Sequence, residues 1–272
     1  MKLLLALVGL PLMGWAALDL SAPSSQDDDP AQAALAATFA AAGIHLDLGA
    51  ATCAIPVTVE VRDDLLEYLL TLPHGAAHET VFLAGQSVGS TEEAVIWAST
   101  FNAALLALGA TPGKNAEWVK KDPAPSDEEQ RAGVSVYDVS PPEGDGFYMY
   151  ATWREGDELF LYRVEDLIRD LERQRTMRRH AWVFLGSKMI ERANGDLGFA
   201  AGLEGNLINV AFFPQGNTLL TGALPECLNQ TTWLPNAWLL PPRGSTVLLV
   251  FSRERLRELP ASLAERVPSL DR

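Results

Sequence analysis

The stretch Cys-Ala-Ile-Pro-Val-Thr-Val-Glu-Val-Arg, residues 53–62, decides the fold of this chain. Its valines alternate with other residues, which is the two-residue period of a half-buried strand. Asp63-Asp64 then indicates a turn, and residues 65–72 form an apolar run that predicts the returning strand of a hairpin. The core is therefore expected to begin with antiparallel β-structure.

The clearest helix signal follows, at residues 91–108. Ser90 and Glu93 form a capping-box pattern at its start, and Gly109 supplies the stop. Large apolar residues recur along it at helical spacing, so one face is expected to be buried. A shorter Ala-rich helix is predicted over residues 30–42.

Most of the second half is strand-like, with short turns between successive strands. Asn194-Gly195 is a strong hairpin turn, because both residues tolerate positive φ. Residues 164–175 and 253–266 predict two further helices, and residues 114–133 a surface loop or a short exposed helix. This mixture favours an α+β fold, in which a mostly antiparallel sheet packs with one long central helix and a few shorter helices.

The N-terminus has the layout of a secretory signal peptide. Met1-Lys2 precedes an uncharged apolar run, and Gly14-Trp15-Ala16 offers small residues for cleavage after Ala16. We expect a signal peptide at residues 1–16, a flexible Ser/Pro/Asp-rich linker at 17–35 and a single domain at 36–272. The alternative is an uncleaved anchor, although the run is short for a span of about 20 apolar residues.

Composition excludes several classes of partner. The 272 residues are 48% hydrophobic and 21% charged, which is a globular composition. The net charge of −14 repels nucleic acid and anionic membranes. We therefore expect no nucleic-acid partner and no membrane span in the mature chain.

The two cysteines, Cys53 and Cys227, fit an exported protein in either of two states. They could form one disulfide, as exported proteins often do. They could equally be two separate buried thiols, which behave as small apolar groups. No Cys/His spacing resembles a zinc site, and two cysteines cannot hold an iron–sulfur cluster alone, so no metal and no cofactor is predicted.

His78-Glu79 lies between two predicted strands, where a core needs neither residue. Neighbours on a strand point to opposite faces, so the two side chains are not expected to touch. His78 is a candidate general base or metal ligand. The alternative is a histidine bonded to a carbonyl at a strand end, with Glu79 in solvent.

Residues 85–89, Gly-Gln-Ser-Val-Gly, match the G-x-S-x-G pattern of a nucleophile elbow. Ser87 would be the nucleophile, and His180 is the only later histidine that could serve it. An α/β-hydrolase needs several strands before its elbow, and too few mature residues precede Ser87 to supply them. The alternative is a glycine-rich connection whose Ser90 caps the following helix.

Several short motifs, in this order and spacing, resemble the bacterial YdjY-domain family. The matching pieces are Val57-Thr58-Val59-Glu60-Val61, Leu66-Glu67-Tyr68-Leu69, His78-Glu79-Thr80-Val81-Phe82, residues 102–109 with Pro112-Gly113, and residues 182–187. The resemblance spans residues 53–251. It implies an exported protein of a largely uncharacterised family. Some relatives carry cysteine-rich, ferredoxin-like segments, which this chain lacks, so no redox role carries over.

The resemblance raises His78, Glu79 and Glu67 as candidate catalytic residues and lowers Ser87, which lies outside the matched motifs. Candidate binding residues are Ser187, Trp182 and Asn102.

We expect a periplasmic or extracellular protein that acts as a binding or envelope-associated module, with an unknown small molecule or envelope protein as its partner. The alternative is an extracytoplasmic hydrolase that uses His78 with a carboxylate, or Ser87.

Overall fold

The structure, a computed structural model, describes residues 30–270. The predicted signal peptide at residues 1–16 lies outside this range, and so does most of the predicted linker. Within the described range, no helix combines the length and the apolar character that crossing a bilayer requires.

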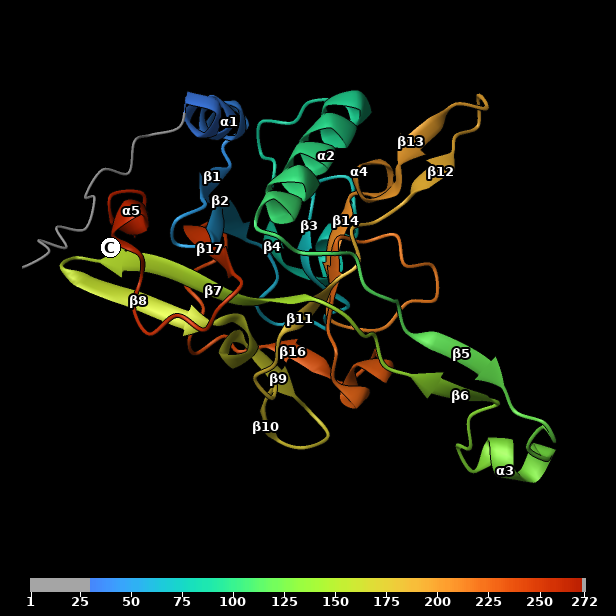
Figure 1. Cartoon of the computed structure of the whole chain (residues 1–272). Helices are drawn as coiled ribbons and strands as arrows, with labels where there is room; N and C mark the ends of the chain where they lie inside the picture. Colours follow the sequence, from blue (N-terminus) through green and yellow to red (C-terminus); the bar gives the residue numbers. More distant parts are fainter. Residues whose placement is uncertain (1–29, 271–272) are drawn as a thin grey trace, which may run out of the picture.

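The body of the molecule is a closed β-barrel (Figure 1). Its ring consists, in order, of β2 (Thr52–Val59), β17 (Thr246–Ser252), β7 (Gly146–Glu155), β11 (Trp182–Phe184), β15 (Leu220–Thr221), β14 (Asn206–Asn209), β3 (Tyr68–Thr71) and β4 (Thr80–Leu83). The ring closes because β4 also pairs with β2, at Thr58–Leu83 and Val59–Phe82. Three strands pair outside it, β1 (His45–Asp47) on β2, and β8 (Glu158–Arg163) and β18 (Ser269–Leu270) on β7.

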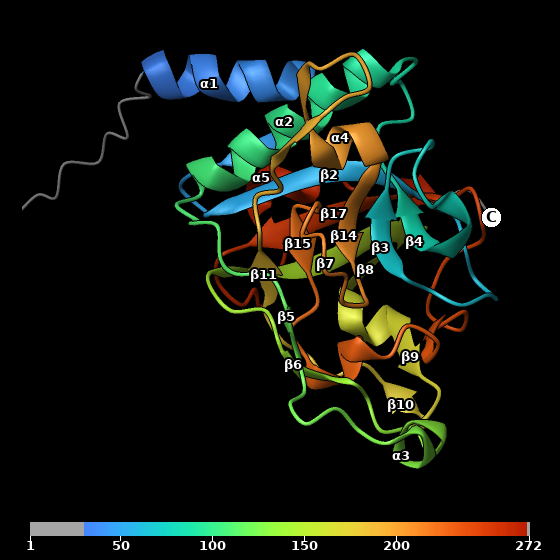
Figure 2. The ribbon, with the colours of Figure 1, turned by 90° about the vertical axis from the view of Figure 1, so that its right-hand side faces the viewer.

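The predicted α+β fold with a long central helix is therefore wrong. Helix α2 (Thr91–Ala107) forms as predicted, and the Ser90 hydroxyl accepts a hydrogen bond from the Glu93 N–H. It lies beside α1 (Pro30–Ala41) on one side of the barrel and not at its centre (Figure 2). The hairpin expected between residues 53–62 and 65–72 is also wrong, since β3 pairs with β14 and, in parallel, with β4.

The core fills the barrel and extends beneath α2. Ile55, Val57 and Val59 of β2 point into it and are fully or almost fully buried. Phe101 of α2 packs edge-on against Phe251 of β17, with ring centroids 5.1 Å apart. Phe101 and Phe251 thus belong to one apolar cluster, and its packing holds α2 against the barrel.

The remaining helices and strands are short and lie outside the ring of the barrel. They include α3 (Asp127–Arg131), α4 (Ala200–Glu204), α5 (Ala261–Ala264), the 3-10 helices η1 (Ala77–Glu79), η2 (Val164–Leu167) and η3 (Pro225–Leu228), and the strands β5 (Glu117–Lys120), β6 (Tyr137–Ser140), β9 (Ile168–Asp170), β10 (Arg175–Thr176), β12 (Met189–Glu191), β13 (Leu197–Phe199) and β16 (Trp233–Pro235). The hairpin predicted at Asn194-Gly195 joins β12 to β13, and the exposed helix α3 lies in the predicted surface segment.

Two predicted helices are largely replaced by other structure. Residues 164–175 begin with η2 but continue into β9, which pairs with β16 from far along the chain. Residues 253–266 contain only the four-residue α5. The amphipathic pattern was present in both segments, but tertiary pairing and packing decided their conformation.

Helices α2 and α4 approach closely because Gly202 has no side chain. A Cβ atom on Gly202 would lie 2.5 Å from the Cα of Val95 and 2.9 Å from the carbonyl oxygen of Ala94. Both contacts are with backbone, which cannot rotate away. We expect Gly202→Ala to lower the free energy of unfolding by about 1–3 kcal/mol, the usual cost of overpacking, as measured by urea denaturation.

The matched control is Gly89→Ala. There the new Cβ would meet only the Glu93 carboxylate, at an ordinary distance of 3.4 Å. We expect a change within about 0.5 kcal/mol. Equal destabilisation by the two substitutions would contradict the close α2–α4 contact.

Candidate functional site

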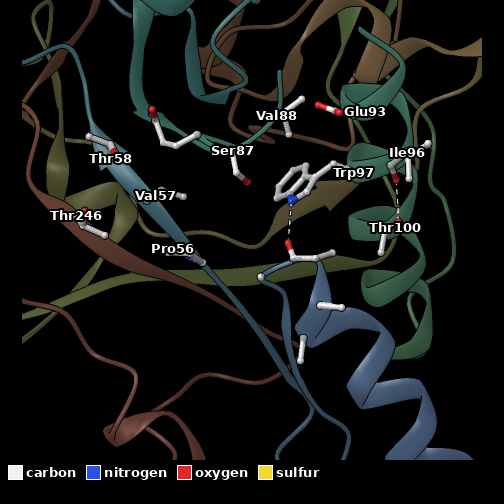
Figure 3. A pocket seen from close by; sticks show the side chains of 16 residues that line it. Pro56, Val57, Thr58, Ser87, Val88, Glu93, Ile96, Trp97, Thr100 and Thr246 are labelled. Atoms are coloured by element: carbon white, nitrogen blue, oxygen red, sulfur yellow. Dashed lines mark hydrogen bonds between the residues drawn. The ribbon is translucent and has the colours of Figure 1, made fainter. Parts of the chain in front are cut away.

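A groove of about 730 Å³ opens between α1, α2 and β2 (Figure 3). Trp97 of α2 faces Pro56, Val57 and Thr58 of β2 across the opening, and Ile96 of α2 also lines the groove. The remaining lining residues are Ala40, Ala41, Ala42, Gly43, Gly85, Gln86, Ser87, Val88, Glu93, Thr100 and Thr246. This volume is within the range of small-molecule sites, about 300–1,000 Å³.

The groove exists because β2 has a gap on one edge. The pairing with β1 ends at Ala54, and the pairing with β4 begins at Thr58. Val59 exchanges backbone hydrogen bonds with residues 244 and 245, on the β17 side. Since backbone groups alternate in direction along a strand, Thr58 and Pro56 face the other side, and Pro56 is the residue that faces the gap.

Proline has no N–H, so no backbone donor is left unpaired at this gap. Other polar groups at the groove are also satisfied within the protein. Trp97 Nε1 donates to the Ala42 carbonyl oxygen (3.0 Å), and Glu93 Oε2 accepts from the Gly89 N–H (2.7 Å). These bonds fix the groove walls without needing a ligand.

The structure does not bring Ser87 and His180 together. Ser87 is exposed at the groove, on the loop before α2. His180 is buried elsewhere, stacked on Trp182 with ring centroids 5.0 Å apart, and its Nδ1 lies 3.0 Å from the Arg178 carbonyl oxygen. Burial lowers the pKa of His180. The geometry at Ser87 is that of the glycine-rich connection, with Ser90 as the helix cap.

His180 belongs to a buried polar cluster around Glu165. The Glu165 carboxylate is fully buried and accepts hydrogen bonds from Arg163 Nε (3.0 Å), Arg163 Nη2 (2.5 Å), Trp182 Nε1 (3.1 Å) and the His180 N–H (3.2 Å). Burying a charge is costly unless the charge is paired and hydrogen-bonded, as that of Glu165 is, so we assign this cluster a structural role. The candidate binding residue Trp182 belongs to the same cluster and is itself fully buried.

His78, Glu79 and Glu67 do lie together. His78 and Glu79 are in η1 and not on a strand, so the expectation that they would not touch is wrong: His78 Nε2 is 3.7 Å from Glu79 Oε1. The Glu67 backbone N–H donates to the Glu79 carbonyl oxygen (3.1 Å), which holds the two segments side by side. The imidazole is 80% exposed.

The carboxyl of Glu67 has a raised pKa. Burial is the main cause, the charge and hydrogen bond of Glu79 raise the pKa further, and His78 partly opposes the shift. In the Glu67–Glu79 pair, Glu67 therefore keeps its proton to a higher pH than an ordinary glutamate does. Such a pair can act as an acid or base, or accept hydrogen bonds from a ligand.

The other predicted residues are not in these sites. Ser187 Oγ donates to the Asn217 carbonyl oxygen (2.5 Å) and accepts from the Ala201 N–H (3.1 Å). Asn102 lies on α2 but not among the groove residues. Cys53 and Cys227 are free buried thiols, the second of the two alternatives, and burial raises the pKa of both. Residues 30–270 contain no group of three His, Cys, Asp or Glu side chains placed to hold a metal ion.

Sequence reasoning missed Pro56, Ile96 and Trp97 as site residues. Two signals were present: a proline inside a strand pattern, which indicates an unpaired edge, and Ile96, an apolar side chain outside the buried stripe of its helix. Ile96 is 65% exposed.

The raised pKa of Glu67 makes a testable contribution to stability. The pKa of Glu67 is higher in the folded protein than in the unfolded chain. Between these two pKa values Glu67 is protonated in the folded state and ionised in the unfolded state, so the free energy of unfolding falls as the pH rises. The stabilisation is complete below the unfolded pKa and is lost as the pH rises through the folded pKa. We expect Glu67→Gln to reduce this fall in the free energy of unfolding, measured by urea denaturation from mildly acidic to neutral pH.

Glu79→Gln should reduce this fall only in part, because it removes the charge of Glu79 but leaves Glu67 buried. Glu128→Gln, at an exposed glutamate of α3, is the matched control and should leave the pH profile unchanged. A Glu67→Gln profile that superimposes on that of the natural protein would refute the raised pKa of Glu67.

Comparison with known proteins identifies the family. The model of the YdjY domain matches residues 56–252, a range that includes the second half of β2, the carboxyl pair and α2. No curated protein and no solved structure matches the chain. The match covers well over half of the 272 residues and confirms the resemblance carried by the sequence motifs. The chain therefore belongs to the YdjY-domain family.

Proposed function

We propose that this protein is an exported binding module and that its groove takes an uncharged, mainly apolar small molecule. The observation that carries the proposal is the groove of about 730 Å³ between α1, α2 and β2. A pocket with apolar walls and a few polar groups is the usual form of a small-molecule site.

The apolar character of the groove comes from apolar side chains that are exposed at its walls. Ile96 is 65% exposed and stands beside Trp97 at the groove. Val88 and three alanines from the end of α1 continue the apolar wall. An apolar ligand would remove this surface from water, which contributes roughly 25 cal/mol per Å².

The polar groups favour a neutral ligand. Glu93 is the only ionisable residue among the lining residues, and its carboxylate already accepts a hydrogen bond from Gly89. No cation in the lining would balance an anionic ligand. The side chains of Gln86, Ser87 and Thr58 remain to bind a neutral polar end.

The groove offers little to a peptide that would bind as an additional β-strand. Strand addition depends on main-chain hydrogen bonds to an open sheet edge. Here the gap spans only residues 55–57, and Pro56 supplies no N–H. Side-chain packing is therefore the interaction that this gap offers, which supports a small molecule.

A second candidate function, an extracytoplasmic hydrolase, is favoured by one observation. Glu67, whose pKa is raised, is hydrogen-bonded through its backbone to Glu79, which contacts the exposed imidazole of His78. An acid with a raised pKa suits proton donation at neutral pH. None of the three residues lines the groove, so substitutions can separate acid–base activity from groove binding.

The groove proposal predicts that a charge at Ile96 abolishes apolar binding. We expect the neutral dye N-phenylnaphthylamine to bind with increased fluorescence, and Ile96→Glu to weaken this binding at least tenfold, because the new carboxylate would lose water on binding. Fluorescence titration measures the effect. Ile96 is exposed, so the fold should tolerate the change.

Leu106→Glu is the matched control. Leu106 is on the same helix and is 42% exposed, but it does not line the groove. This variant should bind the dye like the natural protein. Equal losses in both variants, or no dye binding by the natural protein, would refute the groove as an apolar site.

The export proposal rests on the leader sequence, Met1 to Ala16. We expect a fusion of residues 1–40 to alkaline phosphatase, which is active only outside the cytoplasm, to be active in bacteria. The same fusion with Leu4, Leu5 and Ala6 replaced by arginine should be inactive. N-terminal sequencing of the exported protein should begin at Ala17, and an intact Met1 on an exported product would favour the anchor.

A further inference from the structure

A second pocket, of about 240 Å³, lies between β3, β14 and the loop that joins β14 to β15. None of its lining residues is shared with the groove. Its volume is several times that of one water, about 30 Å³, so it can hold a small organic group. It therefore needs an explanation of its own.

The wall of this pocket contains a buried amide without a partner. Asn209 is 1% exposed and lines the pocket, and its Oδ1 has no hydrogen-bond partner among the described residues. A buried polar atom that stays unpaired costs stability, and a ligand that bonds to it removes that cost. Asn209 is held there by strand register, opposite Tyr68 of β3 and beside Thr221 of β15.

Other polar groups converge on the same space. Asn217 donates through Nδ2 to the Glu204 carboxylate, while its Oδ1 is buried and unpaired. Asn206 accepts a hydrogen bond from the Ala76 N–H through Oδ1 (2.9 Å), which fixes the amide and leaves Nδ2 free to donate. The pocket thus presents both donors and acceptors in fixed orientations.

An aromatic surface forms another side. Phe213 stacks on Tyr68 with ring centroids 5.3 Å apart and planes at 4°. Tyr68 is almost buried, whereas Phe213 is half-buried. The exposed part of the Phe213 ring therefore gives the pocket an apolar surface beside the amides.

The charges around the pocket exclude an anionic ligand. The lining contains the Glu204 carboxylate and no lysine or arginine. Lys188 lies nearby, but its ammonium donates to the Gln215 carbonyl oxygen (2.6 Å). An anion would meet a carboxylate with no free cation in the lining to balance it.

We propose that this pocket binds one neutral monosaccharide unit. A sugar offers adjacent hydroxyls, which donate and accept at once, and these match the amides of Asn206, Asn209 and Asn217 and the Glu204 carboxylate. It also offers a C–H face, which matches the Phe213 ring. The site is separate from the groove and does not depend on the function proposed for the groove.

Asn209→Leu tests the site, because leucine has the same number and branching of side-chain heavy atoms but cannot bond a hydroxyl. We expect isothermal titration of the natural protein with neutral hexoses, pentoses and N-acetylhexosamines to give saturable binding of at least one sugar. Asn209→Leu should weaken that binding at least tenfold while the melting temperature stays equal or rises, since an unpaired buried polar group has been removed.

Asn102→Leu is the matched control, because it also removes a buried unpaired amide oxygen but lies on α2, outside the pocket. It should leave sugar binding unchanged. Gln215 lies on the exposed loop at the pocket, so Gln215→Ala serves as a second test if Asn209→Leu fails to fold. Gln215→Ala should also weaken sugar binding. Any of three results would overturn the proposal: no sugar saturates the natural protein, folded Asn209→Leu or Gln215→Ala binds like the natural protein, or only alkylammonium ions bind.

Discussion

The structure depends on a short stretch of backbone pairing between β2 and β4. Thr58–Leu83 and Val59–Phe82 close the ring, and hydrogen bonds from the Glu60 and Val61 N–H groups to Val81 and Thr80 extend the closure. Without it, β2 and β4 would be free edges of an open sheet, which tend to pair with other chains. With it, the apolar faces of eight strands enclose one core, and the barrel supplies a rigid frame for both pockets.

The same closure creates the groove. Strand β1 leaves β2 after Ala54, and β4 joins it only at Thr58, so an edge of three residues remains between them. Pro56 lies in this gap and leaves no unpaired N–H there. Helix α2, held by Phe101 against Phe251, then forms the opposite wall. The interruption in the sheet thus forms one wall of the groove.

Strand β3 connects the two polar regions. Glu67, just before β3, takes part in the carboxyl pair with Glu79, while the next residue, Tyr68, lines the polar pocket. Neighbours along an extended chain point to opposite faces, so consecutive residues serve different regions. Burial and the charges of Glu67, Glu204 and Glu79 raise the pKa of Tyr68, so its hydroxyl stays protonated to a higher pH than that of an ordinary tyrosine. The electrostatics of the carboxyl pair therefore extend to the neighbouring pocket.

The sequence named His78, Glu79 and Glu67 as candidate residues, but only the structure showed that His78 and Glu79 touch. The local features that the sequence alone determined are the limits and cap of α2 and the hairpin at Asn194-Gly195. Each depends on residues close together in the chain, whose conformational preferences act locally. Only the tertiary structure decided the closed barrel, the conversion of residues 168–170 from predicted helix to β9, and the positions of both pockets. These features require pairing between segments far apart in the sequence, and a local pattern of apolar and polar residues specifies which face is buried but not which strand lies beside it.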